Sequence, residues 1–148
     1  MAGLHACMVI IGLTGGIGTG KSEVARTMGD LGAVVIEADR LGHEVYASDT
    51  AAYREIVDTF GSGILDKSED IDRDKLGALV FADPEALKRL NEITHPRIRE
   101  LLKKRLKTLE QNGARVVAVE AALLFDAAWD DLVDEVWAIS APTSQIEE

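Results

Sequence analysis

The chain has 148 residues and a net charge of −10, from 16 Lys and Arg against 26 Asp and Glu. This length suits one domain, and a composition with 47% hydrophobic and 28% charged residues is typical of globular proteins, which argues against disorder and against a disulfide-stapled miniprotein. The acidic balance disfavours sequence-independent nucleic-acid binding, because such binding needs a basic surface. Small anionic ligands remain compatible with it, since a local site can be positive within a negative protein.

The sequence contains no membrane or secretion signal. Its longest apolar stretch near the start, at 6–13, is far shorter than the ~20 residues of a spanning helix. No Lys or Arg precedes Lys21, so the basic beginning of a signal peptide is missing. The single cysteine, Cys7, cannot form an intrachain disulfide and fits a reducing compartment. We therefore expect a cytoplasmic protein without membrane contact; the sequence does not indicate its oligomeric state.

The first elements in the chain alternate between strand and helix. The run at 8–14 is continuously apolar between glycines, which predicts a strand that is buried on both faces. A helix is predicted at 20–31, where apolar residues form one stripe and Gly32 follows the end. A second short strand is predicted at 33–36. Residues 1–7 have no periodicity and are expected to form a loose extension.

The middle of the chain reads as helical. Helices are predicted at 40–47 and 51–60, and a helical block runs from 72 to about 111. The acidic stretch at 66–74 is expected to be a solvated turn. Pro96 is expected to break or kink the block, because proline lacks the N–H donor and its ring clashes with the preceding turn.

Two further buried strands, at 115–119 and 135–139, complete the predicted elements. Strands that alternate with helices predict an α/β fold with a parallel sheet covered on both faces, a three-layer arrangement. We expect one domain over residues 1–148, with a core of about 8–39 and 112–148. A helical, substrate-binding insertion of about 40–111 separates the two parts of that core.

The strongest motif follows the first strand. Residues 15–22, Gly-Gly-Ile-Gly-Thr-Gly-Lys-Ser, match the P-loop pattern, with a strand before it and a helix after it. In such a loop the backbone N–H groups and the helix N-terminus hold phosphate oxygens, Lys21 contacts the β- and γ-phosphates, and Ser22 can bind Mg²⁺. The predicted nucleotide-binding residues are Gly16, Gly18, Thr19, Gly20, Lys21, Ser22 and Glu23, and the predicted ligands are ATP and Mg²⁺.

Asp39 follows the second predicted strand, where ligands collect in open α/β sheets. Its carboxylate could accept the proton of an attacking hydroxyl. It could equally cap a helix that begins at Arg40, and both roles are compatible. His43 lies four residues later and can share a helix face with Asp39. A metal site made from these two is disfavoured, because no third ligand is evident.

Glu120 ends the third predicted strand. An apolar strand that ends in an acidic residue is the usual support for Mg²⁺ in P-loop proteins, which makes Ser22 and Glu120 the candidate metal residues.

Several stretches in the same order resemble the dephospho-coenzyme A kinase family, a family of P-loop kinases. They are the P-loop at 13–22, the Glu-Ala-Asp segment at 35–45, the middle region at 71–84, the His-Pro element at 95–98 and the stretch Glu-Ala-Ala-Leu-Leu-Phe-Asp at 120–126. The chain departs from the family pattern at Glu37, where Asp is usual, at Ala122, where Pro is common, and at Asp126, where Glu is common.

The resemblance implies transfer of the γ-phosphoryl group of ATP to the ribose 3′-hydroxyl of dephospho-CoA, the last step of coenzyme A biosynthesis. It makes Asp39 the general base and Lys21 the phosphate clamp, both catalytic. Thr14, Asp39, His43 and His95 become candidate substrate residues. For His95 the alternative is structural, a His before Pro that helps to cap the next helix.

The resemblance also implies a further helix, an arginine-bearing lid and a last strand after Pro142. The sequence offers no candidate for them before Glu148, so a weak or inactive kinase is expected. The alternatives to the implied activity are a different P-loop nucleoside or nucleotide kinase and a nucleotide-binding form with little catalysis.

Overall fold

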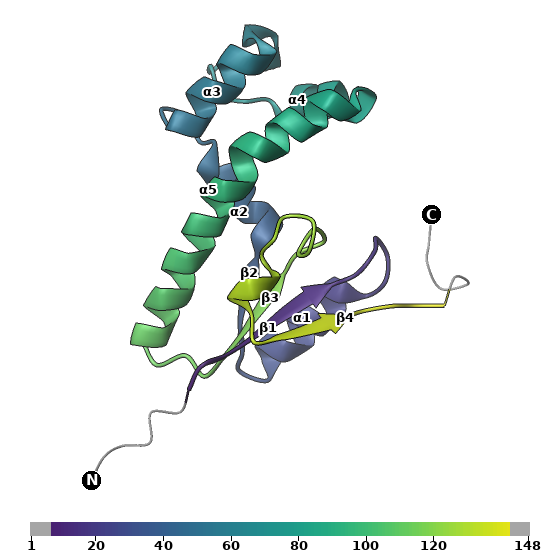
Figure 1. The fold of residues 1–148 in the computed structure, drawn as a ribbon, viewed down its shortest axis with the longest axis vertical. Coiled ribbons are helices and arrows are strands. Elements are labelled where there is room, and N and C mark those ends of the chain that lie inside the picture. Colours follow the sequence, from purple (N-terminus) through teal and green to yellow (C-terminus); the bar gives the residue numbers. More distant parts are fainter. Residues whose placement is uncertain (1–6, 143–148) are drawn as a thin grey trace. The chain divides into compact units, whose positions relative to one another are not determined.

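A computed structural model of the chain describes residues 7–142, which include a four-stranded sheet (Figure 1). The strands are β1 (Val9–Thr14), β2 (Val34–Glu37), β3 (Val116–Glu120) and β4 (Glu135–Ala138). They pair in the order β2-β3-β1-β4, and every pairing is parallel. The four predicted strands and the predicted parallel sheet are confirmed. The predicted burial of the last strand is wrong: β4 is exposed or half-buried along its length, because it lies at the edge of the sheet. The loose extension expected at 1–7 and the helix expected after Pro142 fall almost entirely outside the described residues.

The register of the sheet brings the carboxyl ends of the strands to one level. Glu120 of β3 is the partner of Leu13 in β1 and of Glu37 in β2. Thr14, the last residue of β1, pairs with Ala138 at the end of β4. The residues that follow these strands therefore gather at one edge of the sheet, which is where open α/β sheets bind ligands.

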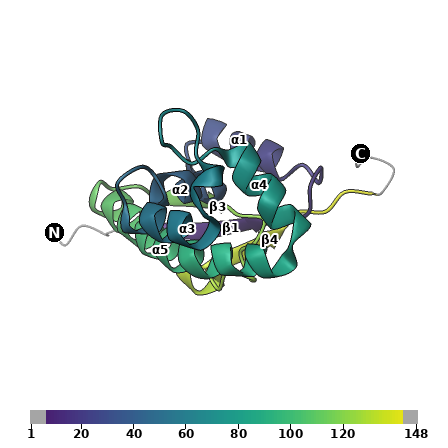
Figure 2. The same ribbon diagram turned by 90° about the horizontal axis from the view of Figure 1, so that it is seen from above.

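Helix α1 (Lys21–Asp30) covers one face of the sheet, as Figure 2 shows. The apolar residues between helix and sheet come from α1, β1 and β3; their buried centre is Ile11, Leu13, Ala25 and Ala118. On the opposite face, a β-carbon at Gly12 would lie 2.8 Å from Leu124 and 3.2 Å from Val133, so the loop after β3 packs closely there. The final turns of helix α5 (Pro84–Gln111) and strand β2 line one groove. Helices or loops thus cover both faces, as the fold class predicts.

The chain divides into two compact units. The sheet unit is made of residues 1–39 and 102–148, and the helical unit is made of residues 40–101. The predicted insertion begins at the same residue, whereas the last turns of α5 cluster with the sheet because Leu102 and Leu106 are buried. A short 3-10 helix, Asp130–Leu132, precedes β4 in the sheet unit.

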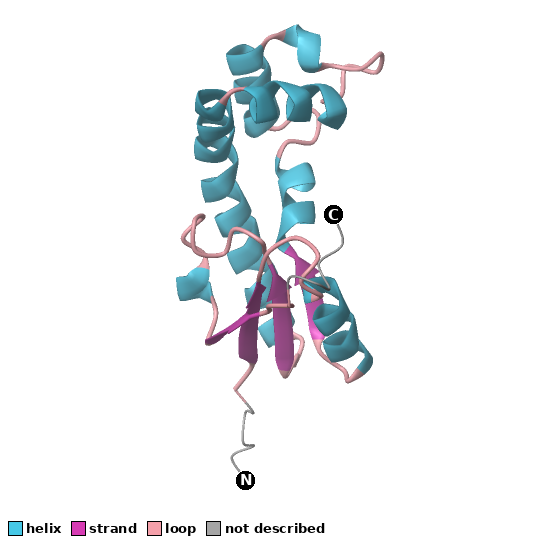
Figure 3. Cartoon of the chain, turned by 90° about the vertical axis from the view of Figure 1, so that its right-hand side faces the viewer, coloured by secondary structure: helices cyan, strands magenta, loops and turns pink. Residues whose placement is uncertain are grey.

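The helical unit consists of helices and loops and, over its fully described residues, contains no strand (Figure 3). Helices α2 (Ala38–Val45) and α5 extend into it. It also holds α3 (Ala51–Phe60), a 3-10 turn (Ser62–Ile64) and α4 (Arg73–Ala82). Ile56, Ile64, Leu76 and Ile93 are among the buried residues that pack together as its core. The predicted acidic turn is present: the Asp66 carboxylate accepts the N–H groups of Ser68 and Asp70, and Asp72 caps α4.

Pro96 does not break the helical block, so of the two predicted effects the break does not occur and the kink stays a prediction. Helix α5 runs through Pro96 without interruption. An internal proline removes one backbone hydrogen bond and crowds the carbonyl groups of the preceding turn. Here the Arg97 side chain donates to the Ile93 carbonyl oxygen at 2.6 Å, and the Thr94 hydroxyl donates to the Leu90 carbonyl oxygen at 2.9 Å. Side chains thus satisfy carbonyl groups next to the disturbed turn. No helix among residues 7–142 is long and apolar enough to span a membrane.

Candidate active site

The glycine-rich loop lies between β1 and α1, as predicted. Gly18 has a φ of 74° and Gly20 has a φ of 90°, backbone conformations that residues with a β-carbon rarely adopt. The Thr19 hydroxyl donates to the Gly16 carbonyl oxygen at 2.8 Å and closes the loop on itself. The side chain of Ile17 is 93% exposed at the tip. The loop therefore holds its shape through its own backbone and leaves its concave side available to a ligand.

One position of the loop is fixed by close packing against β4. A β-carbon at Gly15 would lie 2.9 Å from the Thr19 hydroxyl and closer still to the carbonyl oxygen of Ile139. The Ile139 N–H in turn donates to the Thr14 carbonyl oxygen at 2.7 Å. Only a residue without a side chain lets the loop leave the sheet at this point.

Helix α1 begins where the loop ends. Gly20 is its N-cap and adopts the left-handed conformation without a side-chain cap. The first backbone bond of the helix runs from the Val24 N–H to the Gly20 carbonyl oxygen at 3.1 Å, so the N–H groups of the first turn have no carbonyl partner one turn earlier. Lys21 is the first helical residue, and its ammonium makes no ion pair with residues in the described range. These donors and this cation form a site suited to an anion.

Ser22 and Glu120, the predicted metal residues, are in direct contact. The Ser22 hydroxyl donates to Glu120 Oε1 at 2.7 Å, which joins the first turn of α1 to the end of β3. Both offer oxygen ligands, which Mg²⁺ prefers. Residues 7–142 contain no cluster of three or more His, Cys, Asp or Glu that could hold a metal by itself. The pair thus fits an ion that takes its remaining ligands from phosphate and water.

Asp39 lies in the first turn of helix α2 (Ala38–Val45), two residues after the end of β2. Because α2 begins at Ala38, Asp39 stands inside the helix, and the predicted capping of a helix that starts at Arg40 does not occur. The side chain is exposed, and within the described part of the chain its carboxylate has no hydrogen-bonding partner. Its position at the carboxyl edge of the sheet leaves it available to a ligand.

The other predicted substrate residues lie in different places. Thr14 is buried at the end of β1, and its hydroxyl points to the Ala122 carbonyl oxygen at 3.5 Å, which is a long contact. His43, in the last turn of α2, meets the ring of Tyr46 edge to face with 6.0 Å between ring centres. His95 is half-buried within α5. Both histidines belong to the helical unit, whereas the loop and Asp39 belong to the sheet unit.

Sequence reasoning missed two charged residues near this site. Glu37 ends β2 directly beside Glu120, and the signal that identified Glu120, an apolar strand ending in an acidic residue, applies to Glu37 as well. Arg26 forms an ion pair with Glu23 in α1, at a spacing of three residues that is common for such pairs in helices.

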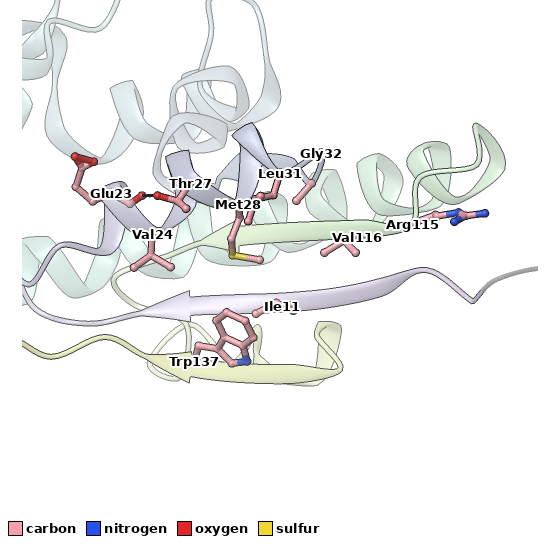
Figure 4. A pocket seen from close by; sticks show the side chains of 11 residues that line it. Ile11, Glu23, Val24, Thr27, Met28, Leu31, Gly32, Arg115, Val116 and Trp137 are labelled. Atoms are coloured by element: carbon pink, nitrogen blue, oxygen red, sulfur yellow. Dashed lines mark hydrogen bonds between the residues drawn. The ribbon is translucent and has the colours of Figure 1, made fainter.

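A large apolar groove also borders α1, but it is separate from the glycine-rich loop. It has a volume of about 720 Å³ and lies between α1 and the strands β1, β3 and β4. Figure 4 shows Trp137, Ile11 and Val116 along the strands and Met28 above them. None of Gly15 to Ser22 lines the groove. Of the predicted nucleotide-binding residues only Glu23 lines the groove, so the groove is distinct from the glycine-rich loop.

Comparison with known proteins identifies the family. The family model for dephospho-CoA kinase matches residues 9–147. The chain is 51% identical over 136 residues to the dephospho-CoA kinase of Moorella thermoacetica and 52% identical over 132 residues to that of Geobacter sulfurreducens. These alignments cover 91% and 89% of the chain, but 64% and 67% of the two relatives, so the chain spans about two thirds of their length.

Solved structures give the same result. The protein TT1252 from Thermus thermophilus superposes with a TM-score of 0.75 at 33% identity, over 93% of this chain and 68% of that protein. The dephospho-CoA kinase of Campylobacter jejuni superposes with a TM-score of 0.68 at 30% identity, over 86% of this chain and 64% of that enzyme. The fold is that of the P-loop kinases, and the chain belongs to the dephospho-CoA kinase family.

Proposed function

We propose that this chain performs the ATP-dependent phosphorylation of the ribose 3′-hydroxyl of dephospho-CoA. The observation that carries the proposal is the glycine-rich loop with Lys21 and the Ser22–Glu120 pair, at the same sheet edge as Asp39. Family membership supports the acceptor, because the curated relatives are named for this reaction. The product of such a reaction is coenzyme A, and the cytoplasm is the compartment that we propose for it.

The loop supplies the phosphate-binding groups. Backbone N–H groups of residues 16–23 would donate to the phosphate oxygens, and the Lys21 ammonium would offset the charge on the β- and γ-phosphates. Ser22 would bind Mg²⁺ through its hydroxyl oxygen. Glu120 would support the ion indirectly, by accepting a hydrogen bond from that hydroxyl or from a water on the ion. A bound Mg²⁺ would neutralise phosphate charge during the transfer.

Asp39 would act as the general base. Its carboxylate takes the proton of the 3′-hydroxyl while the hydroxyl oxygen forms a bond to the γ-phosphorus and the bond from that phosphorus to the β–γ bridging oxygen breaks. ADP leaves with the electron pair of the broken bond. The exposed carboxylate, which has no partner within residues 7–142, suits this role because a base must be able to contact its substrate. Thr14, His43 and His95 are proposed to contact the acceptor.

The test is to measure ADP release by the purified chain with ATP, Mg²⁺ and dephospho-CoA. Other nucleosides and nucleotides offered one at a time serve as competing acceptors. We expect dephospho-CoA alone to raise ADP release. A stronger response to another acceptor would favour a different P-loop kinase, and ATP binding without transfer to any acceptor would favour a nucleotide-binding form.

A substitution at Asp39 tests the base. Asp39→Asn keeps the shape of the side chain, and the carboxylate that it removes makes no contact in the described structure, so the melting temperature should stay the same. Loss of a general base typically lowers the rate by ~10²–10⁴-fold. Asp49→Asn, an exposed Asp in the helical unit, is the matched control and should keep the parental rate. Parental turnover in Asp39→Asn would exclude the base role.

A further inference from the structure

A carboxylate lies within the phosphate-binding turn itself. Glu23 is the third residue of α1 after the N-cap Gly20. A Glu at this position commonly bends back and accepts the N–H group of the N-cap residue. In this chain the N–H groups around Gly20 are those that we propose to hold phosphate. A Glu23 carboxylate bent toward them would occupy the site as an internal anion and would repel an incoming one.

In the structure this carboxylate is bonded to Arg26 instead. Arg26 donates from Nε to Glu23 Oε2 at 3.0 Å, and from Nη2 to Oε1 at 3.0 Å and to Oε2 at 2.9 Å. Within residues 7–142 the Gly20 N–H makes no hydrogen bond to this carboxylate. The Glu23 carbonyl oxygen accepts the Thr27 hydroxyl at 2.9 Å, as Figure 4 shows. Arg26 also lies 3.8 Å from Asp30, one turn further along α1.

The ion pair contributes little to folding. The two side chains are 67% and 68% exposed, and exposed pairs at this spacing add only weakly to stability. The Arg26 guanidinium nevertheless donates to both carboxylate oxygens of Glu23, the residue that follows Ser22. We propose that Arg26 is a positioning residue, which holds the Glu23 carboxylate away from the phosphate-binding N–H groups and keeps the loop open to ATP. This inference rests on the proposed function, since it requires ATP to bind at the loop.

The test is the affinity for ATP, measured by calorimetry at low ionic strength on the whole chain. Arg26→Gln removes the guanidinium and should raise the Kd for ATP by about three- to tenfold. This is the factor expected if the Glu23 carboxylate then leaves the loop open in only about a third to a tenth of the molecules, because the apparent Kd is the intrinsic Kd divided by the open fraction. Glu23→Gln should bind ATP at least as tightly as the parent. In the double variant Arg26→Gln with Glu23→Gln the penalty should disappear, and Arg26→Lys should restore part of the affinity.

Two controls separate positioning from folding and from direct contact. Asp30→Asn removes the other carboxylate beside Arg26 and should leave the Kd unchanged, and the melting temperature should differ little among all these variants. A penalty that persists in the double variant would mean that Arg26 binds the nucleotide directly, which overturns the inference.

Lys21→Ala distinguishes this inference from the proposed function. If Lys21→Ala weakens ATP binding and Arg26→Gln does not, the inference is refuted and the ATP site is retained. If the parent chain has no affinity for ATP, the proposed function and the inference both fail.

Discussion

Replacement of Gly15 by alanine should damage the glycine-rich loop more than replacement of its neighbour Gly16. At Gly15 the new methyl group would overlap the carbonyl oxygen of Ile139 and lie 2.9 Å from the Thr19 hydroxyl. A backbone carbonyl cannot rotate away as a side chain can, so the loop or the end of β4 must move. At Gly16 the methyl group would lie 3.6 Å from the Thr19 methyl carbon, an ordinary contact.

The expected magnitude follows from overpacking and from lost phosphate contacts. Overpacking of this kind typically costs about 1–3 kcal/mol, and for a chain of this size each kcal/mol lowers the melting temperature by about 2–4 °C. A decrease of about 2–12 °C is therefore expected for Gly15→Ala. Displacement of even one charge-assisted hydrogen bond, worth about 1.5–3 kcal/mol, should raise the Kd for ATP by about tenfold to a hundredfold.

Thermal unfolding followed by circular dichroism and ATP calorimetry measure the two effects. Gly16→Ala serves as the matched control, with a stability change within about 0.5 kcal/mol. The reasoning is refuted if the two alanine variants have the same melting temperature and the same ATP affinity, because then the contact between Gly15 and Ile139 does not constrain the loop.

Three further predictions concern the predicted metal residues, the core of the helical unit and a half-buried phenol. Glu120→Gln can still accept the Ser22 hydroxyl but loses the charge, so Mg²⁺ should strengthen ATP binding less than in the parent, as calorimetry with and without Mg²⁺ would show. Ile56→Ala should lower the free energy of unfolding by about 2–5 kcal/mol in urea titration, because Ile56 is fully buried in the helical unit. Burial raises the pKa of the Tyr46 phenol above 10.0. The stability that the neutral phenol contributes is therefore complete below pH 10.0 and is lost as the pH rises through the raised pKa. Phenolate absorbance and unfolding measured at alkaline pH would test this.

The strands were predictable because each contains a short apolar run, and three of them end in a polar residue, at Thr14, Glu37 and Glu120. Burial on both faces of a parallel sheet requires such a run, and the register then follows from pairing these runs side by side. Sequence reasoning also named Ser22 and Glu120 as metal residues, and they lie close together because the helix after β1 and the end of β3 meet at one edge; their direct hydrogen bond was not predicted.

Other features depended on contacts that a linear pattern does not encode. Pro96 predicts a break from its own chemistry, but whether a helix tolerates it depends on which side chains satisfy the neighbouring carbonyl groups, as Arg97 does here. The boundary of the helical unit depends on whether Leu102 packs with the sheet unit, which a stripe at helical spacing cannot indicate. The Glu23 rotamer is set by Arg26, and the motif alone specifies only the backbone at that position.

An acidic protein that binds a triphosphate must overcome its own charge at the site. Glu37 and Glu120 are register partners on adjacent strands, which lie about 4.8 Å apart, and Asp39 follows at the same edge. If ATP binds at the loop as we propose, the charges of Glu120 and Asp39 would oppose the approach of free ATP. A divalent cation between the phosphates and this edge would turn the repulsion into attraction on both sides. The proposed function therefore predicts that Mg²⁺·ATP binds more tightly than free ATP, because Mg²⁺ would make carboxylates compatible with an anion-binding loop at the same edge.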